Sequence, residues 1–246
     1  MALTASPDDQ ALLLDLQALD TKLQQLDHRA KGLPEHAVLV DLAKQSEAIR
    51  ATFAEQSGTW EDAKIELSRV ESDVAVVEAR IARDTERLQG SSSVKDVAAF
   101  EQEITALKKR QNDLEEIELT VMEKLDEAEK AVAGTRAQLE ALQGQVAAAE
   151  ATRDDALGAL DSERTNATAN RRTIEGKVPA DLLALYEKQR ARYGAGASHL
   201  RGGVSTASGV KLNSHDMQLV RAAAPEDVLL CPESSAILVR TAESGL

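Results

Sequence analysis

Apolar residues recur at alternating intervals of three and four residues between Val97 and Leu160. Fifteen of the nineteen positions in this series are apolar, and the segment contains no proline and only three glycines. An average period of 3.5 residues keeps one apolar seam directed at a partner helix, which is typical of a coiled coil. As a continuous helix the segment would be roughly 95 Å long, so it needs a partner of similar length.

A second seam precedes the first and has the same spacing. It runs from Leu39 to Leu88 with twelve apolar residues at fifteen positions, and it stops at the sequence Gly90–Ser93. A glycine followed by three serines is a typical helix end, turn and new helix start. Two arms of matching length, roughly 8–89 and 94–172, predict an antiparallel coiled-coil hairpin in which each arm covers the other's seam.

The first arm has a predicted start and a predicted interruption. Ser6 can cap a helix whose first turn contains Pro7, and two aspartates follow, which favour the positive end of the helix dipole. The sequence Gly32–Pro34 should break or kink the helix, because proline lacks a backbone donor and clashes with the preceding turn. Apolar side chains outside the seam, such as Leu13 and Val76, leave further association of the rod open.

The C-terminal part of the chain has a different character. A short helix is expected over Pro179–Arg192, folded back on the base of the hairpin, and five glycines then fall between residues 194 and 209. A helix-like piece and two β-like runs follow, at Ser214–Ala224, Val228–Cys231 and Ala236–Thr241. We therefore predict a mainly α fold: an elongated, kinked hairpin over 1–175, with its turn near 90–93, and a small β-containing domain over 176–246.

Composition and charge agree with this division. Five aromatic residues among 246 are too few for an ordinary globular core, and Ala, Leu, Glu, Gln, Arg and Lys are typical of long helices. Residues 1–175 carry 21 Lys and Arg against 35 Asp and Glu, whereas residues 176–246 carry 8 against 7. An acidic stalk repels phosphates, so any nucleic-acid contact is expected in the C-terminal third.

Cysteine content and hydropathy bear on the compartment. Cys231 is the only cysteine, so an intrachain disulfide framework is excluded. The sequence shows neither a secretory leader pattern at its start nor an apolar run of about 18 residues. We expect a cytoplasmic protein without membrane contact.

Several features together resemble the bacterial C4-type zinc-ribbon proteins, particularly their actinobacterial members. They are the hairpin pattern, the Leu-Tyr-Glu-Lys-Gln-Arg helix at Leu185–Arg190, the Gly-rich link and the ending Ile237–Leu246. The resemblance covers nearly the whole chain and is most specific in its C-terminal third. It implies a long coiled-coil hairpin that carries a small zinc-ribbon-like domain.

The resemblance also implies where zinc would be held. Family members use two Cys-x-x-Cys pairs, which correspond here to Ser205 with Ser208 and to Cys231 with Ser234. A serine hydroxyl stays protonated near neutral pH and is a poor zinc ligand. We therefore expect a degenerate, metal-free domain without a cofactor, in which Cys231 is a half-buried small residue.

Packing must then replace the metal in this domain. The expected apolar core consists of Val210, Leu212, Met217, Leu219, Val220, Val228, Leu229, Leu230, Ile237, Leu238 and Val239. Small domains without a staple are only marginally stable, so we expect this one to be less stable than the stalk.

Enzyme signatures are missing from the sequence. It has no phosphate-binding Gly-x-x-x-x-Gly-Lys loop, no Gly-x-Ser-x-Gly and no His-Glu-x-x-His, and the four histidines are scattered. Acidic runs such as Glu115-Glu116 are explained as solvated faces of the coiled coil. We expect no catalysis and no small-molecule substrate.

Two binding functions remain. The first is an adaptor or scaffold for partner proteins, because a rod offers long faces and separate ends; the resemblance agrees, since relatives include partners of an alternative sigma factor and of secretion or flagellar components. The alternative is RNA or DNA binding through the basic base of the stalk, where Tyr186 and Tyr193 would stack on bases. The contact residues for nucleic acid would be Lys188, Arg190, Arg192 and Arg201, with Arg171, Arg172, Lys177 and His199 nearby.

Overall fold

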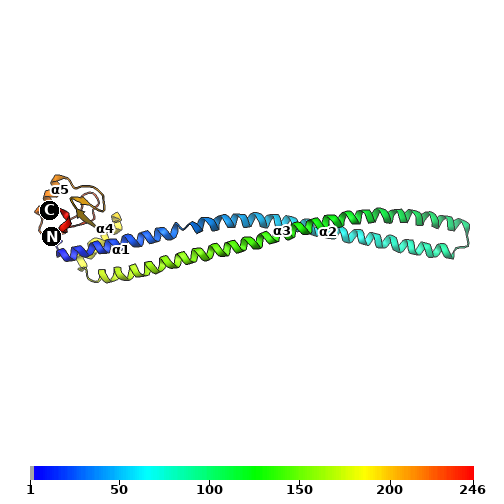
Figure 1. Ribbon diagram of the computed structural model, residues 1–246, viewed down its shortest axis with the longest axis horizontal. Helices are drawn as coiled ribbons and strands as arrows, with labels where there is room; N and C mark the ends of the chain where they lie inside the picture. Colours follow the sequence, from blue (N-terminus) through cyan, green and yellow to red (C-terminus); the bar gives the residue numbers. More distant parts are fainter. Residues whose placement is uncertain (1–2) are drawn as a thin grey trace. The chain divides into compact units, whose positions relative to one another are not determined.

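The computed structural model describes residues 3–246 as a long helical hairpin followed by a small sheet (Figure 1). The elements are α1 (Pro7–Lys31), α2 (Pro34–Gly90), α3 (Val94–Glu175), α4 (Ala180–Tyr193), β1 (Ala197–Arg201), β2 (Val204–Ser205), α5 (Ser214–Ala222), β3 (Ile237–Val239) and the 3-10 helix η1 (Ala242–Ser244). The predicted mainly helical fold class is confirmed. No helix within residues 3–246 is long and apolar enough to span a bilayer.

The chain divides into two compact units. One, the terminal unit, combines the residues up to Pro34 with Thr152–Leu246, and the other, the hairpin unit, is Glu35–Ala151. The helices α2 and α3 each contribute to both units. The hairpin unit therefore contains consecutive parts of α2 and α3, whereas the terminal unit combines α1 with the end of α3, which is distant from it in sequence.

Helix α1 begins and ends where the sequence predicts. The Ser6 hydroxyl accepts a 3.1 Å hydrogen bond from the Asp9 N–H, and Pro7 occupies the first turn. At the other end Gly32 N–H donates to the His28 carbonyl at 3.0 Å, and α2 starts at Pro34. The proline cannot donate the backbone hydrogen bond that would continue α1 into α2.

The hairpin unit buries the predicted seam. Its buried side chains all occupy predicted seam positions: Leu42, Ala63, Val70 and Asp84 on α2, and Leu114, Val121, Ala128, Val132, Thr135 and Leu142 on α3. Polar seam residues pair across the helices, with Thr135 Oγ1 donating to Gln56 Oε1 at 2.6 Å. The α2 helix ends at Gly90 and α3 begins at Val94, so residues 91–93 connect the two helices.

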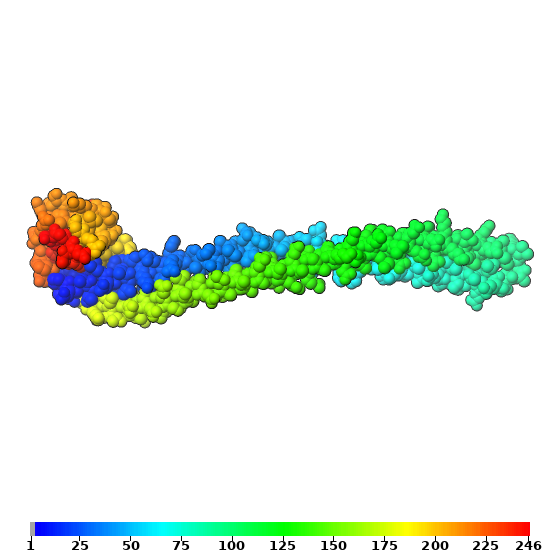
Figure 2. Space-filling model, viewed as in Figure 1, coloured from blue at the N-terminus to red at the C-terminus, as the bar shows by residue number. Residues whose placement is uncertain are grey.

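The terminal unit packs α1 and the end of α3 against α4 and the sheet. Strand β1 lies between β2 and β3 in the sheet. It pairs antiparallel with β2 and parallel with β3. The larger core of the terminal unit is formed by apolar side chains from α1, the α3–α4 connection, α4, β1 and β3: Leu13, Leu16, Val178, Leu182, Tyr186, Ala197, Ile237 and Val239. The predicted return of the short helix onto the hairpin is confirmed, and in Figure 2 the red C-terminal residues lie against the blue start of α1.

Two details of the sheet prediction are wrong. The run Val228–Cys231 is not a sheet strand, and it contributes only an isolated bridge between Leu230 and Ile237. Instead β1 and β2 come from the Gly-rich link. Gly202 and Gly203 form the tight two-residue turn that joins these strands. Their φ values are 56° and 77°, which glycine adopts without strain.

The predicted core is also partly wrong. Leu212, Val220 and Leu238 are buried with Cys231 in a second cluster, but Val210, Leu219 and Leu230 are 47%, 58% and 46% exposed. Leu13 was expected on the surface of the rod, yet it is fully buried against the terminal unit's core. The expected surface of α1 is thus an internal interface.

Candidate functional site

The first tetrapeptide of the predicted ligand positions, residues 205–208, begins a turn at the end of β2. Ser205 N–H donates to the Val210 carbonyl at 3.1 Å, and Gly209 N–H donates to the Ser205 carbonyl at 2.8 Å. Ser208 Oγ accepts a 3.2 Å hydrogen bond from Val210 N–H. Gly209 has a φ of 66°, so the left-handed backbone closes the turn.

The second tetrapeptide repeats this pattern before β3. Cys231 N–H donates to the Ala236 carbonyl at 2.8 Å, and Ser235 N–H donates to the Cys231 carbonyl at 2.9 Å. Ser234 Oγ accepts from Ala236 N–H at 3.4 Å, and Ser235 has a φ of 57°. The 205–210 and 231–236 turns therefore have the same hydrogen-bond scheme.

The two turns face each other through buried polar atoms. Cys231 Sγ and Ser205 Oγ lie 3.4 Å apart, and Ser205 Oγ lies 2.7 Å from Ser198 Oγ. All three residues are at most 1% exposed, so Cys231 is fully rather than half buried. The structure thus brings together one residue from each predicted ligand pair, and each keeps a hydrogen-bond partner.

Hydrogen bonds modify the acidity of this thiol. Burial acts to raise the pKa of Cys231, but its hydrogen bonds with Ser205, Ser234 and the backbone outweigh burial and hold the pKa below its ordinary value. A lone thiol with three hydroxyls at the other ligand positions is nevertheless an unsuitable donor set for zinc, which requires thiolates or imidazoles. Within residues 3–246 no three His, Cys, Asp or Glu side chains are grouped so that they could hold a metal ion.

The predicted nucleic-acid contacts do not form one open basic surface. Arg190 donates to Glu187 Oε2 at 2.7 Å, and Arg201 donates to Glu243 Oε2 at 2.7 Å. Lys188 is exposed on α4, and the Arg192 guanidinium lies 5.2 Å from the ring centre of Tyr193. Two of the four cations are therefore paired with carboxylates.

Tyr186 was expected to stack on bases, and the structure corrects this. Its side chain is fully buried, and its hydroxyl donates a 2.6 Å hydrogen bond to Asp20. Asp20 also accepts a 2.7 Å hydrogen bond from Arg171, whose guanidinium contacts Glu187 and Glu175 as well. These residues form an internal ion network that joins α1, α3 and α4, so Arg171 and Arg190 help to hold the fold.

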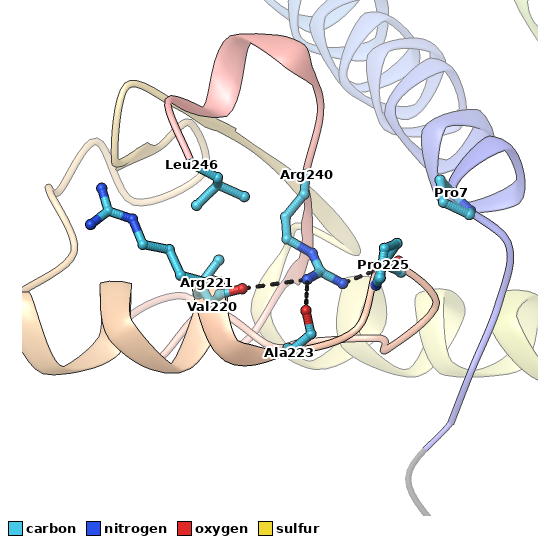
Figure 3. A pocket seen from close by; sticks show the side chains of 7 residues that line it. All are labelled: Pro7, Val220, Arg221, Ala223, Pro225, Arg240 and Leu246. Carbon is cyan, nitrogen blue, oxygen red and sulfur yellow. Dashed lines mark hydrogen bonds between the residues drawn. The ribbon is translucent and has the colours of Figure 1, made fainter.

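A pocket of about 410 Å³ lies beside α5 (Figure 3). It is lined by Pro7, Val220, Arg221, Ala223, Pro225, Arg240 and Leu246. The Arg240 guanidinium is directed at backbone carbonyls, among them those of Ala223 at 3.0 Å and Asp227 at 2.8 Å. These contacts occupy its donors, so Arg240 fastens the loop after α5 to β3.

The sequence reasoning missed the residues that assemble this unit. Gln17 Oε1 accepts hydrogen bonds from the backbone N–H groups of Gly196 at 2.7 Å and Ala197 at 3.2 Å. No motif marks Gln17 or Arg240 by itself. The partners of Gln17 are far from it in the sequence, and the partners of Arg240 are carbonyl groups of a loop. A signal did exist for the missed β1–β2 hairpin, because the pair Gly202-Gly203 is a typical two-residue turn.

Comparison with known proteins identifies relatives over nearly the whole chain. A family model described as the CT398-like coiled coil hairpin domain matches residues 16–194. Two uncharacterised proteins from strains of Mycobacterium tuberculosis are each 32% identical over 232 residues, which cover 94% of this chain and 95% of the relative.

Solved structures show the same fold. A structure from Mycobacterium smegmatis is 32% identical, with a TM-score of 0.87 over 97% of this chain and 100% of its own. The structure of CT398 from Chlamydia trachomatis is 19% identical, with a TM-score of 0.66 over 95% of this chain and 98% of its own. At that identity the second likeness concerns the fold alone.

Proposed function

Given that this chain belongs to the CT398-like coiled coil hairpin family, we propose that it is a non-catalytic cytoplasmic adaptor that binds partner proteins. The observation that carries the proposal is the exposed apolar surface of the hairpin unit. Val76, Leu119 and Met122 are 62%, 63% and 48% exposed, although the seam between α2 and α3 is already filled. Leu119 and Met122 lie three residues apart on one face of α3, and adjacent exposed apolar side chains that the fold does not use favour a protein partner.

The distribution of reactive groups supports a role without catalysis. His28, His36 and His215 lie on three separate helices, and His199 Nε2 is hydrogen-bonded to Thr241 at 2.7 Å. The buried thiol of Cys231 is adjacent to hydroxyls rather than to a histidine base. Nucleophilic catalysis requires an accessible nucleophile next to a base, and this arrangement offers Cys231 neither access nor a base.

We also propose that the 205–210 and 231–236 turns are a zinc-ribbon relic. Their shared hydrogen-bond scheme and the contact between Ser205 and Cys231 support this descent. In the relic, hydroxyl and thiol hydrogen bonds replace metal coordination. The partner-binding role then does not depend on a metal.

Nucleic-acid binding is the alternative, and the ion pairs weigh against it. Arg190 and Arg201 would have to give up Glu187 and Glu243 to contact phosphates, and Tyr186 is inaccessible. Fluorescence anisotropy of the full chain with mixed-sequence RNA and DNA tests this alternative. Tight binding that falls steeply with salt and is abolished by Lys188→Glu with Arg192→Glu would replace the adaptor proposal.

Photo-crosslinking in cells that naturally produce this protein tests the adaptor proposal directly. A photoreactive phenylalanine analogue is placed at exposed Val76 or Leu119 in the hairpin unit, or at exposed Arg221 in the terminal unit. The adaptor proposal expects discrete protein adducts at one or more positions, and these should be lost without irradiation. If all three positions yield only the uncrosslinked chain, the proposal is wrong.

A further inference from the structure

The negative charge of the hairpin unit is concentrated in its middle. Residues 35–151 contain 25 Asp and Glu against 14 Lys and Arg. The segments 55–78 and 113–130 contain 15 of these acids and only 4 of the bases, whereas the rest of the unit contains 10 of each. We call these two segments the acidic belt; they are the neighbouring cyan and green parts of α2 and α3 in Figure 2.

The belt contains a surface groove between the two helices. Two adjoining hollows of about 430 and 300 Å³ share Glu66 of α2 and Lys124 of α3 in their lining. Their acidic lining comes from both helices: Asp62, Glu66, Asp113, Glu116 and Glu127. Lys124 is the only base among the lining residues of the two hollows, so the groove has a strongly negative edge.

The floor and one wall of the groove are apolar. Ala63 and Ala128 line the first hollow and Val121 lines the second, and each is at most 9% exposed. Ile117 lines the second hollow with 43% of its surface exposed. An apolar floor between carboxylates suits a ligand that has an apolar stripe flanked by cations.

The groove's length fits a helical ligand. Its α3 lining extends from Asp113 to Ala128, which is about 22 Å of helix. A ligand helix of about 16 residues has that length. Its apolar positions at intervals of three and four would face the floor, and its lysines and arginines would face the acidic edge.

We propose that the acidic belt binds a basic amphipathic helix of a partner protein along this groove. The proposal rests on the adaptor function and adds the chemical class of the partner segment. Charge complementarity selects the occupant, because the belt's excess of eleven acids over bases attracts a basic helix and repels an acidic one. The apolar floor favours a basic helix with an apolar stripe over a ligand that carries only positive charges.

A model peptide provides the probe. It is a fluorescein-labelled helix of about 16 leucines and lysines, with leucine at intervals of three and four. A scrambled peptide of the same composition keeps the charge and loses the apolar stripe. Anisotropy titrations with the full chain at low and moderate salt should show tighter binding of the patterned peptide, weakened by salt.

Matched variants locate the binding. The triple variant Glu66→Gln, Glu116→Gln, Glu127→Gln should raise the peptide's Kd roughly tenfold, because three charge pairs are lost. The control Glu47→Gln, Glu101→Gln, Glu140→Gln makes the same change in net charge outside the belt and should change Kd less than about twofold. Ile117→Ser should raise Kd roughly fivefold, whereas Val40→Ser, which is 57% exposed against 43% for Ile117 and lies outside the belt, should leave it unchanged.

The outcomes separate this inference from the adaptor proposal. Equal effects of the two triple variants, or equal binding of the patterned and scrambled peptides, would overturn the groove even if cellular adducts form. If the belt variants change the peptide's Kd more than their controls do, but no cellular adduct forms, the groove is supported and the adaptor proposal is not. Self-association of the chain that the belt triple variant abolishes would make a second copy the occupant and overturn the proposal.

Discussion

The phenol of Tyr186 on α4 donates a 2.6 Å hydrogen bond to the carboxylate of Asp20 on α1. Both side chains are buried, and Arg171 on α3 donates to the same carboxylate at 2.7 Å. A buried carboxylate is tolerated when its charge is paired and its oxygens accept hydrogen bonds. One aspartate thereby joins α1 to α3 and α4, whose contact residues follow it by 151 and 166 positions.

Replacing Asp20 should loosen the terminal unit. Asp20→Ala leaves the Tyr186 hydroxyl and the Arg171 guanidinium without their buried acceptor, so we expect a loss of about 3 kcal/mol. Hydrogen exchange measured by mass spectrometry should show reduced protection over residues 180–201. Asp27→Ala is the matched control, because the pair of Asp27 with Arg164 is exposed at 3.5 Å and contributes less than about 1 kcal/mol. Equal protection in the two variants would refute the role of Asp20.

The same contact predicts sensitivity to alkali. Burial, followed by the hydrogen bond to Asp20, raises the pKa of Tyr186 far above its ordinary value of 10. The unfolded chain releases the phenolic proton above pH 10 while the folded chain keeps it, so the stability that Tyr186 contributes is present below pH 10 and lost above it. The expected slope is up to about 1 kcal/mol per pH unit.

Phenylalanine variants isolate the alkaline effect. In the wild type, the protection of the terminal unit against hydrogen exchange should decline between pH 10 and 11. Tyr186→Phe should make this decline shallower, although the variant is less stable than the wild type at pH 7. Tyr193→Phe removes a phenol that is 48% exposed and should retain the wild-type slope. A slope unchanged by Tyr186→Phe would assign the alkaline loss to other groups.

Gly196 allows β1 to approach α4. A methyl group there would lie 2.5 Å from the Tyr186 ring and 2.7 Å from its carbonyl oxygen. Gly196→Ala should therefore cost about 1–3 kcal/mol, measured as the loss of exchange protection in β1 and β3. Gly158→Ala in α3 is the control, since nothing lies within 4 Å of its added methyl and alanine favours a helix. Stability of Gly196→Ala equal to that of Gly158→Ala would contradict the close approach.

The hairpin could be predicted because its information is local and repeated. Each seam position is specified by spacing alone, and Leu114, Val121 and Ala128 are buried at the predicted positions. The turn at Gly90 and the break before Pro34 follow from single residues with strong backbone preferences.

The terminal unit could be predicted only in part, because its contacts are not local. Leu13 lies outside the seam, so its spacing predicts a surface position, but it packs with Tyr186 and Ile237 from the other end of the chain. Likewise the sequence predicts Arg190 as a contact for nucleic acid, but Glu187 one turn earlier pairs with it. The groove in the acidic belt required the pairing of α2 and α3, which decides which carboxylates share one face.

The matching turns at 205–210 and 231–236 lead to a gain-of-function prediction. If they are a zinc-ribbon relic, the backbone still presents positions 205, 208, 231 and 234 to one point. The triple variant Ser205→Cys, Ser208→Cys, Ser234→Cys would then supply four thiolates with Cys231 and should bind one Zn²⁺ per chain. Metal binding should stabilise the terminal unit against unfolding, because zinc binds only the folded arrangement with high affinity.

Cobalt substitution provides the readout for this variant. Tetrahedral thiolate coordination of Co²⁺ gives intense visible and charge-transfer absorption, and added Zn²⁺ should displace it. The double variant Ser205→Cys, Ser208→Cys, which keeps Ser234, is the control and should bind more weakly because only three thiolates are present. A triple variant that folds and shows no cobalt absorption would mean that the two turns do not converge as metal ligands. The relic would then be refuted, since the shared hydrogen-bond scheme would be a property of two independent turns.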